Sequence, residues 1–130
     1  MLLYPMLDDR NTVPDPELEP FVAWAYDDNA LGWSLLLGDR AGGPDVPAWA
    51  SPARETDYKG LAPAYLEVGT LDIFRDETLR YAANLLAAGV PTKLHLRDGV
   101  THGFDMLAPQ AAISQQAFED RYRAIINLGK

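Results

Sequence analysis

The segment YLEVGTLDIFRDETLRYAANLLAAGVPTKLHLR, residues 65–97, has the pattern of a buried strand, a helix and a second strand. Tyr65–Val68, flanked by Pro63 and Gly69, is predicted to be a strand of a parallel sheet. A helix is predicted next, over about Phe74–Ala88. Because two parallel strands need a crossover of this kind, the segment predicts a right-handed strand–helix–strand unit.

The spacing of residues sets the limits and faces of these elements. Asp76 and Glu77 fall in the first turn of the predicted helix, where the helix dipole favours acids, and Pro91 prevents continuation of the helix. Apolar and polar side chains alternate over residues 92–97, so we expect a strand with one solvated face near the sheet edge. The predicted apolar row of the helix is Leu79, Ala82, Ala83 and Leu86, and the predicted solvated face of the strand is Lys93, His95 and Arg97.

The flanking segments add a third strand and further helices. Leu2–Met6 is an apolar run predicted to be a strand buried on both faces, and the turn acids Asp8 and Asp9 are expected to be solvated. The other predicted elements are short helices at Phe21–Tyr26 and Asn29–Leu37, a loop over Gly42–Pro52, and a last helix over Ala111–Leu128 with Phe118, Tyr122, Ile125 and Ile126 on one face.

This order of elements predicts an α/β fold with about three parallel strands and helices on both faces of the sheet. A sheet this small would keep one edge open where more strands normally pair, so we expect that an N-terminal half of the domain lies outside these 130 residues.

The composition excludes several classes of protein. A net charge of -8 argues against binding of nucleic acid and of anionic membranes, which both need a basic surface. There are no cysteines, so disulfides and thiolate chemistry are excluded, and a cytoplasmic location fits. No apolar run approaches the length of a membrane span.

Two residues with catalytic potential follow neighbouring predicted strands. Asp72 comes just after the strand that ends at Val68, and His102 comes after the strand that ends at Arg97. Reactive groups of open parallel sheets gather at the carboxyl ends of the strands, so the two side chains are expected to meet. A carboxylate on one nitrogen of an imidazole fixes the tautomer that a general base needs.

Simpler interpretations remain open for both residues. Asp72 is also suited to cap the helix that follows it, and Asp76, one helical turn later, is a rival acid that suits the helix dipole. His102 beside a glycine would be an ordinary turn residue. No pair of histidines and acids has the spacing of metal ligands, so no metal site is predicted.

Several motifs resemble those of the hormone-sensitive-lipase-like esterases of the α/β-hydrolase fold. VGTLDIFRDE (residues 68–77) is similar to the acid motif of that family, and THGF (residues 101–104) is similar to its histidine motif. Three further segments match in the same order: LLYPMLDD (residues 2–9), ASPAR (residues 50–54) and LAPAYLEVG (residues 61–69). The resemblance implies that Asp72 is the acid of a catalytic triad and His102 its base.

The resemblance also implies what this sequence does not contain. Family members carry a Gly-x-Ser-x-Gly nucleophile elbow and an oxyanion-hole His-Gly-Gly segment upstream of these motifs, and neither occurs here. The stretch GDRAGG, residues 38–43, looks like the elbow with arginine in place of serine. It follows a predicted helix rather than a strand, so we reject it, and Ser34, Ser51 and Ser114 also lack the context of an elbow.

We therefore expect residues 1–130 to be the C-terminal part of one catalytic domain of a serine carboxylester hydrolase. Its substrate would be a small-molecule ester, and no metal or organic cofactor would be needed. This chain alone is expected to be inactive. A homodimer through the edge strand at residues 93–97 is a further expectation. The alternatives are a non-catalytic remnant that acts as a binding module, or a serine peptidase or lyase of the same fold.

Overall fold

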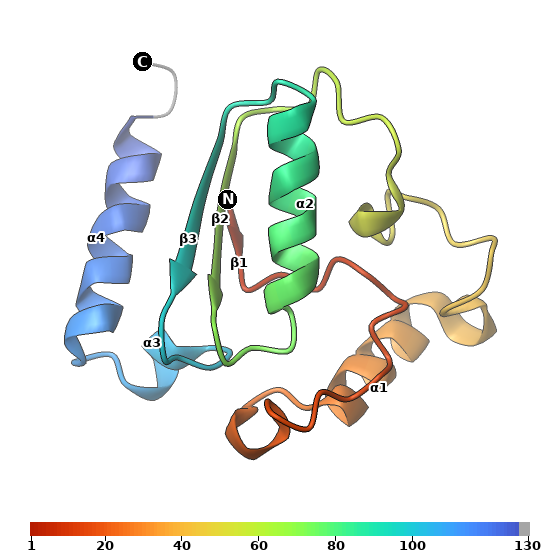
Figure 1. Ribbon diagram of the computed structural model, residues 1–130, viewed down its shortest axis with the longest axis horizontal. Coiled ribbons are helices and arrows are strands. Elements are labelled where there is room, and N and C mark those ends of the chain that lie inside the picture. The colour runs from red at the N-terminus through yellow and green to blue at the C-terminus, as the bar shows by residue number, and fades with distance from the viewer. Residues whose placement is uncertain (128–130) are drawn as a thin grey trace.

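The computed structural model describes residues 1–127, and its centre is a parallel sheet with the strand order β1–β2–β3. The strands are β1 (Leu2–Leu3), β2 (Ala64–Gly69) and β3 (Thr92–Arg97), and both β1 and β3 pair with β2 in parallel. Figure 1 shows helix α2 on one side of the sheet and helix α4 on the other. The predicted α/β arrangement, with three parallel strands and helices on both faces, is confirmed.

The helices are α1 (Tyr26–Leu37), α2 (Arg75–Ala87), α3 (Phe104–Leu107) and α4 (Ala112–Ile126), and the short 3₁₀ turns are η1 (Glu19–Phe21), η2 (Gly38–Arg40) and η3 (Pro52–Arg54). The separate helix predicted at residues 21–26 is wrong, because that segment only joins η1 to α1. The loop predicted at residues 42–52 contains no α-helix or strand. The predicted end of the last helix, Leu128, lies outside the described residues.

The first strand is shorter than the predicted Leu2–Met6, because the backbone changes direction at Tyr4. Tyr4 has a φ of 39°, in the left-handed region that residues with a side chain rarely adopt. Its N–H still donates to the carbonyl of Glu67 on β2, at 2.6 Å. The turn brings the Tyr4 ring against His102, with 4.6 Å between the ring centroids.

Helix α2 covers one face of the sheet with a set of residues that matches the predicted row only in part, since Ala82 is buried as predicted. Leu85 and Ala82 are buried against Leu66 of β2, together with Val90 and Tyr58. Leu86 was expected to be buried, but it is 55% exposed. The contact face includes the polar Thr78, so apolar periodicity alone placed the buried stripe incorrectly. Among residues 1–127 no helix is long and apolar enough to cross a membrane.

Helix α4 covers the other face of the sheet, and here two predictions are wrong. The strand face predicted to be solvated is largely covered: Arg97 is 9% exposed and the His95 ring stacks on Tyr65, although Lys93 is exposed. The residues that α4 buries are Ser114, Ala117 and Arg121. The apolar residues predicted to share one face, Phe118, Tyr122, Ile125 and Ile126, are 39–65% exposed. The reason is electrostatic: Arg121 is turned inward because it pairs with buried Glu67 of β2.

Candidate active site

Asp72 lies in the loop between β2 and α2, at the carboxyl end of the sheet, and is 1% exposed. One carboxylate oxygen, Oδ1, accepts a hydrogen bond from the N–H of Phe74 at 3.0 Å, which orders the turn that leads into α2. The other oxygen, Oδ2, lies 3.1 Å from Nδ1 of His102. The same carboxylate therefore orders the turn before α2 and contacts the imidazole, but Asp72 does not cap the helix, whose N-cap residue is Phe74 without a side-chain cap hydrogen bond.

Asp76, the rival acid, is directed elsewhere. Its side chain is 59% exposed and forms an ion pair with Arg75 at 2.7 Å, and this guanidinium lowers the pKa of Asp76 against the smaller opposing effect of burial. Among residues 1–127, the carboxylate paired with His102 is that of Asp72. The structure thus brings together the acid and the imidazole that the sequence motifs selected.

The His102 ring is surrounded by aromatic side chains from three separate segments. Tyr4 and Phe74 meet it edge-on, with centroid distances of 4.6 and 5.4 Å, and Trp24 lies tilted against it at 5.8 Å. With Nδ1 engaged by Asp72, the nitrogen Nε2 makes no hydrogen bond within the described part of the chain. This is the arrangement that presents Nε2 to an external proton donor.

The acid loop and the histidine loop are joined directly by their backbones. Leu71 N–H donates to the carbonyl of Val100 at 3.0 Å, and Gly99 N–H donates to the hydroxyl of Thr70 at 2.8 Å. The two loops approach so closely at Gly69 that an added Cβ would lie 2.0 Å from the Val100 oxygen. Only glycine fits there, so the separation of Asp72 and His102 is fixed by short local contacts.

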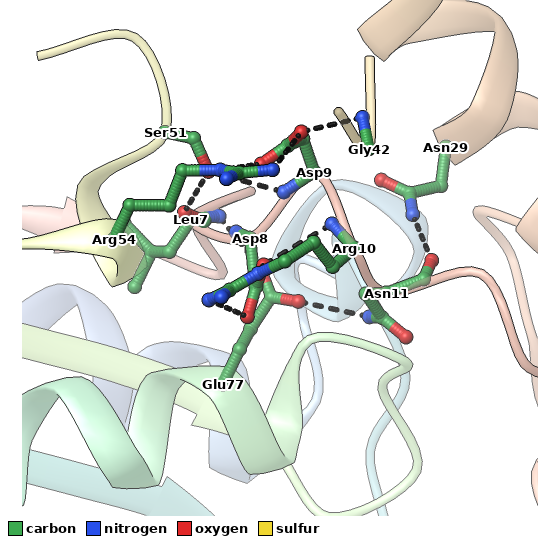
Figure 2. A network of polar contacts seen from close by, with 10 residues as sticks. All are labelled: Leu7, Asp8, Asp9, Arg10, Asn11, Asn29, Gly42, Ser51, Arg54 and Glu77. Carbon is green, nitrogen blue, oxygen red and sulfur yellow. Dashed lines mark hydrogen bonds and ion pairs between the residues drawn. The ribbon is translucent and has the colours of Figure 1, made fainter. Parts of the chain in front are cut away.

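A buried polar network, drawn in Figure 2, anchors the chain after β1 to the first turn of α2. Glu77 is 2% exposed, and its carboxylate accepts hydrogen bonds from the N–H groups of Leu7 and Asp8 and from the Asn11 amide. The Asn11 amide also donates to the carbonyl of Ile73, directly after Asp72, at 3.0 Å. The network therefore supports the loop that carries the acid.

The second half of this network corrects the prediction that Asp8 and Asp9 are solvated. Both are buried, Asp9 at 2% exposure, and the Arg54 guanidinium holds Asp9 with two hydrogen bonds of 2.6 and 2.8 Å. Burial by itself would raise the pKa of Asp9, but Arg54, the Ser51 hydroxyl and the N–H of Gly42 together lower it to about 2. Asp9 is therefore a buried, fully paired carboxylate.

The buried Glu77 predicts a pH dependence of stability. Burial raises its pKa from 4.5 to about 7, although the donors from Leu7, Asn11 and Asp8 oppose the shift. Between pH 4.5 and 7 the unfolded chain releases a proton that the folded chain keeps, so the free energy of unfolding should fall by roughly 3 kcal/mol across this interval. Urea denaturation at a series of pH values from 4.5 to 8 measures this change in the free energy of unfolding.

The control for this effect is a pair of variants. In Glu77→Gln the fall in stability between pH 4.5 and 7 should largely disappear, because the titrating group is gone. In Asp76→Asn, one residue away, it should persist, since the pKa of Asp76 is lowered from 3.8 and lies below the interval. An unchanged pH profile in Glu77→Gln would assign the dependence to another group.

No serine among residues 1–127 hydrogen-bonds to His102. Ser51 and Ser114 are fully buried, and the hydroxyl of Ser34 donates to a carbonyl within α1. The Gly38–Gly43 stretch forms the η2 turn after α1 and a following turn, which is not the strand–turn–helix geometry of an elbow. The described residues also include no group of three or more metal-binding side chains.

Sequence reasoning missed the environment of the histidine. Nothing in the local pattern marked Trp24 or Tyr4 as a neighbour of His102. The sequence did contain one signal of the buried charges that lie beneath the site. Glu67 is a charged residue inside an apolar strand, and a carboxylate buried on a central strand requires cationic partners.

Comparisons with known proteins identify the family of this chain. A family model for the alpha/beta hydrolase fold matches residues 1–106, so the chain belongs to the α/β-hydrolase fold family. Esterase LipI of Mycobacterium tuberculosis is 40% identical over 58 residues, which are 45% of this chain and 18% of LipI. The resemblance to hormone-sensitive-lipase-like esterases, predicted from the motifs, is thereby supported at the level of sequence.

Solved structures give the same result. A bacterial heroin esterase matches 92% of this chain and 38% of its own length, with 38% identity and a TM-score of 0.80. An esterase from the bacterial hormone-sensitive lipase family matches 88% of this chain and 38% of its own, with 25% identity and a TM-score of 0.74. The predicted relationship to these esterases is confirmed, and this chain spans well under half the length of these relatives.

Proposed function

We propose that this chain supplies the acid and the general base of a serine carboxylester hydrolase, with Asp72 as the acid and His102 as the base. The observation that carries the proposal is the 3.1 Å contact between Asp72 Oδ2 and His102 Nδ1, made at the carboxyl ends of β2 and β3. In this role Asp72 holds the proton on Nδ1, so that Nε2 can accept the proton of a serine hydroxyl.

The reaction that follows is acyl transfer from a small-molecule ester. The serine oxygen attacks the ester carbonyl while His102 takes its proton, and the imidazolium then returns that proton to the leaving alcohol. The buried carboxylate of Asp72 stabilises the imidazolium during both steps. These roles require no metal and no organic cofactor.

We further propose that residues 1–130 form the C-terminal part of a single catalytic domain, whose nucleophile elbow and oxyanion hole belong to another segment. Two observations support this: no Gly-x-Ser-x-Gly occurs in the sequence, and the chain matches only 38% of the length of the bacterial heroin esterase. An in-frame Gly-x-Ser-x-Gly in the coding DNA before Met1 would support the proposal.

The purified 130-residue chain is expected to show no hydrolysis of p-nitrophenyl butyrate above the rate in buffer. His102 has no nucleophile to activate, and a triad without its serine retains only weak background catalysis. The measurement is a continuous absorbance assay of released p-nitrophenol. Activity that disappears in Ser34→Ala, Ser51→Ala or Ser114→Ala would contradict the proposal, because the nucleophile would then lie within this sequence.

The edge strand β3 supports a proposal of a two-fold homodimer. Within residues 1–127 it pairs with β2 on one side only, and Lys93 on it is exposed. A hollow of about 390 Å³ lies between the start of the strands and the end of α4, lined by Met1, Tyr65 of β2, Lys93 of β3 and Ile125 of α4 among others. An unpaired strand edge next to exposed apolar side chains is suited to pair with a second copy.

The dimer is tested by multi-angle light scattering at micromolar concentration. The expected mass is twice that of the 14.3 kDa chain, and Ile125→Glu should return it to the monomer by placing a charge in the interface. A single-chain mass for the unchanged protein at these concentrations would remove the proposal.

A further inference from the structure

A layer of buried charges lies between the sheet and α4, and its centre is Glu67. This carboxylate is fully buried on the central strand β2. Its Oε2 accepts hydrogen bonds from the Tyr65 hydroxyl at 2.9 Å and from Arg97 at 2.8 Å, and its Oε1 accepts two from the guanidinium of Arg121, one of them at 3.0 Å. Glu67 is thus held by two arginines at once.

Arg121 extends this layer to the histidine loop. Its third nitrogen, Nη1, donates to Asp105 Oδ2 at 2.5 Å, so one guanidinium joins the carboxylates of Glu67 and Asp105. Asp105 is 4% exposed and stands three residues after His102, in the short helix α3. The loop that carries the imidazole is therefore tied through α4 to the middle of the sheet.

A second connection from the same layer reaches the imidazole ring itself. The N–H of Tyr4 donates to the backbone carbonyl of Glu67, and the Tyr4 ring lies against His102. Burial raises the pKa of the Tyr4 hydroxyl, and the nearby charge of Asp105 raises it further. Tyr4 thus stands close to both Asp105 and His102.

We propose that Asp105, held by Arg121 and Glu67, is a positioning residue for His102. The inference rests on the proposed function, in which His102 must face a nucleophile at a fixed distance, and a displacement of about 1 Å in such a site costs on the order of 10²-fold in rate. Asp105 acts through the loop and touches no reacting atom. Asp105 fixes the loop that carries His102, as the Phe74 N–H fixes the carboxylate of Asp72.

The test uses nitrogen-15 NMR and amide hydrogen exchange on the 130-residue chain. In the unchanged chain, His102 should show a protonated Nδ1 with a slowly exchanging proton, and amides 100–107 should be protected. In Asp105→Asn, amides 100–107 should exchange at least tenfold faster and the Nδ1 proton signal should broaden or vanish. Arg121→Lys should reproduce both changes, because a lysine cannot bridge Glu67 and Asp105 in the same way.

Arg54→Lys is the matched control. Arg54 also forms a two-pronged ion pair with a buried carboxylate, that of Asp9, but this pair contacts Ser51 and Gly42 and, within the described chain, makes no bond to the acid loop or the histidine loop. It should lower the melting temperature and leave the His102 signals and the exchange of amides 100–107 unchanged. A loss of stability in Asp105→Asn and Arg121→Lys with unchanged His102 signals would overturn the proposal, and so would a failure of both variants to fold.

The two proposals fail in distinguishable ways. Loop order and the His102 proton signal are read without any substrate, so they test the positioning role alone. If His102 is ordered as described but an enzyme containing it hydrolyses no ester, the proposed function fails. If ester hydrolysis survives Asp105→Asn with an unchanged His102 spectrum, the positioning role fails and the catalytic assignment stands.

Discussion

Asp72→Asn is expected to reduce kcat for ester hydrolysis by about 10⁴-fold in an enzyme that combines this chain with a nucleophile-bearing half. A neutral amide at this position keeps the shape of the carboxylate, but it does not hold the proton on Nδ1 of His102 or stabilise the imidazolium. The KM should change little, since the buried Asp72 has 1% of its surface exposed and does not reach a substrate.

The measurement needs a complete enzyme, which a chimera provides. In it, this chain replaces the matching 38% of the bacterial heroin esterase, to which it is 38% identical. The remainder of that esterase is expected to supply the nucleophile. Hydrolysis of p-nitrophenyl butyrate by the chimera is compared with that of its Asp72→Asn and His102→Ala variants, which should both be near background.

Asp76→Asn is the matched control in the same chimera. It changes an acid four residues further along, whose carboxylate is solvated and paired with Arg75, so kcat should stay within a factor of about two. A large loss of kcat in Asp76→Asn, with a small loss in Asp72→Asn, would make Asp76 the catalytic acid in place of Asp72. If both acids are dispensable, the contact between Asp72 and His102 is structural and the proposed function is wrong.

Glu67→Ala is expected to cost about 3–5 kcal/mol of the free energy of unfolding, a large part of the roughly 5–15 kcal/mol that stabilises a folded domain. Removing this carboxylate leaves Arg97 and Arg121 buried without their shared partner, and both are only 9% exposed. Arg121 retains Asp105 and Arg97 retains Asp120, but the guanidinium N–H groups that donated to Glu67 are left buried without an acceptor. Urea denaturation followed by circular dichroism gives the change.

Glu119→Ala, on the helix α4 that covers this face of the sheet, provides the comparison. Glu119 pairs with Arg123 on the surface of α4, where both side chains are more than 60% exposed, so its loss should cost less than about 1 kcal/mol. Equal losses in the free energy of unfolding for the two substitutions would show that burial does not determine how much Glu67 contributes to stability.

The elements that lead to the site followed from local sequence. The apolar strand at residues 65–68, the helix between Asp72 and Pro91, and the alternating strand at 92–97 were each recognisable from spacing and from helix-ending residues. Chain order then placed Asp72 and His102 at the same end of the sheet, because a right-handed crossover aligns the ends of parallel strands. Chain order predicted that the two side chains meet, and the tertiary contacts between their loops set the 3.1 Å separation.

Tertiary structure alone decided which faces are buried. Hydrophobic periodicity assumes that apolar residues turn inward, but the buried carboxylate of Glu67 needs cations, and it draws Arg97 and Arg121 into the interior. The apolar row of α4 is left exposed as a result. The two arginines lie 30 and 54 positions from Glu67, so no local window of sequence contains the acid together with its partners.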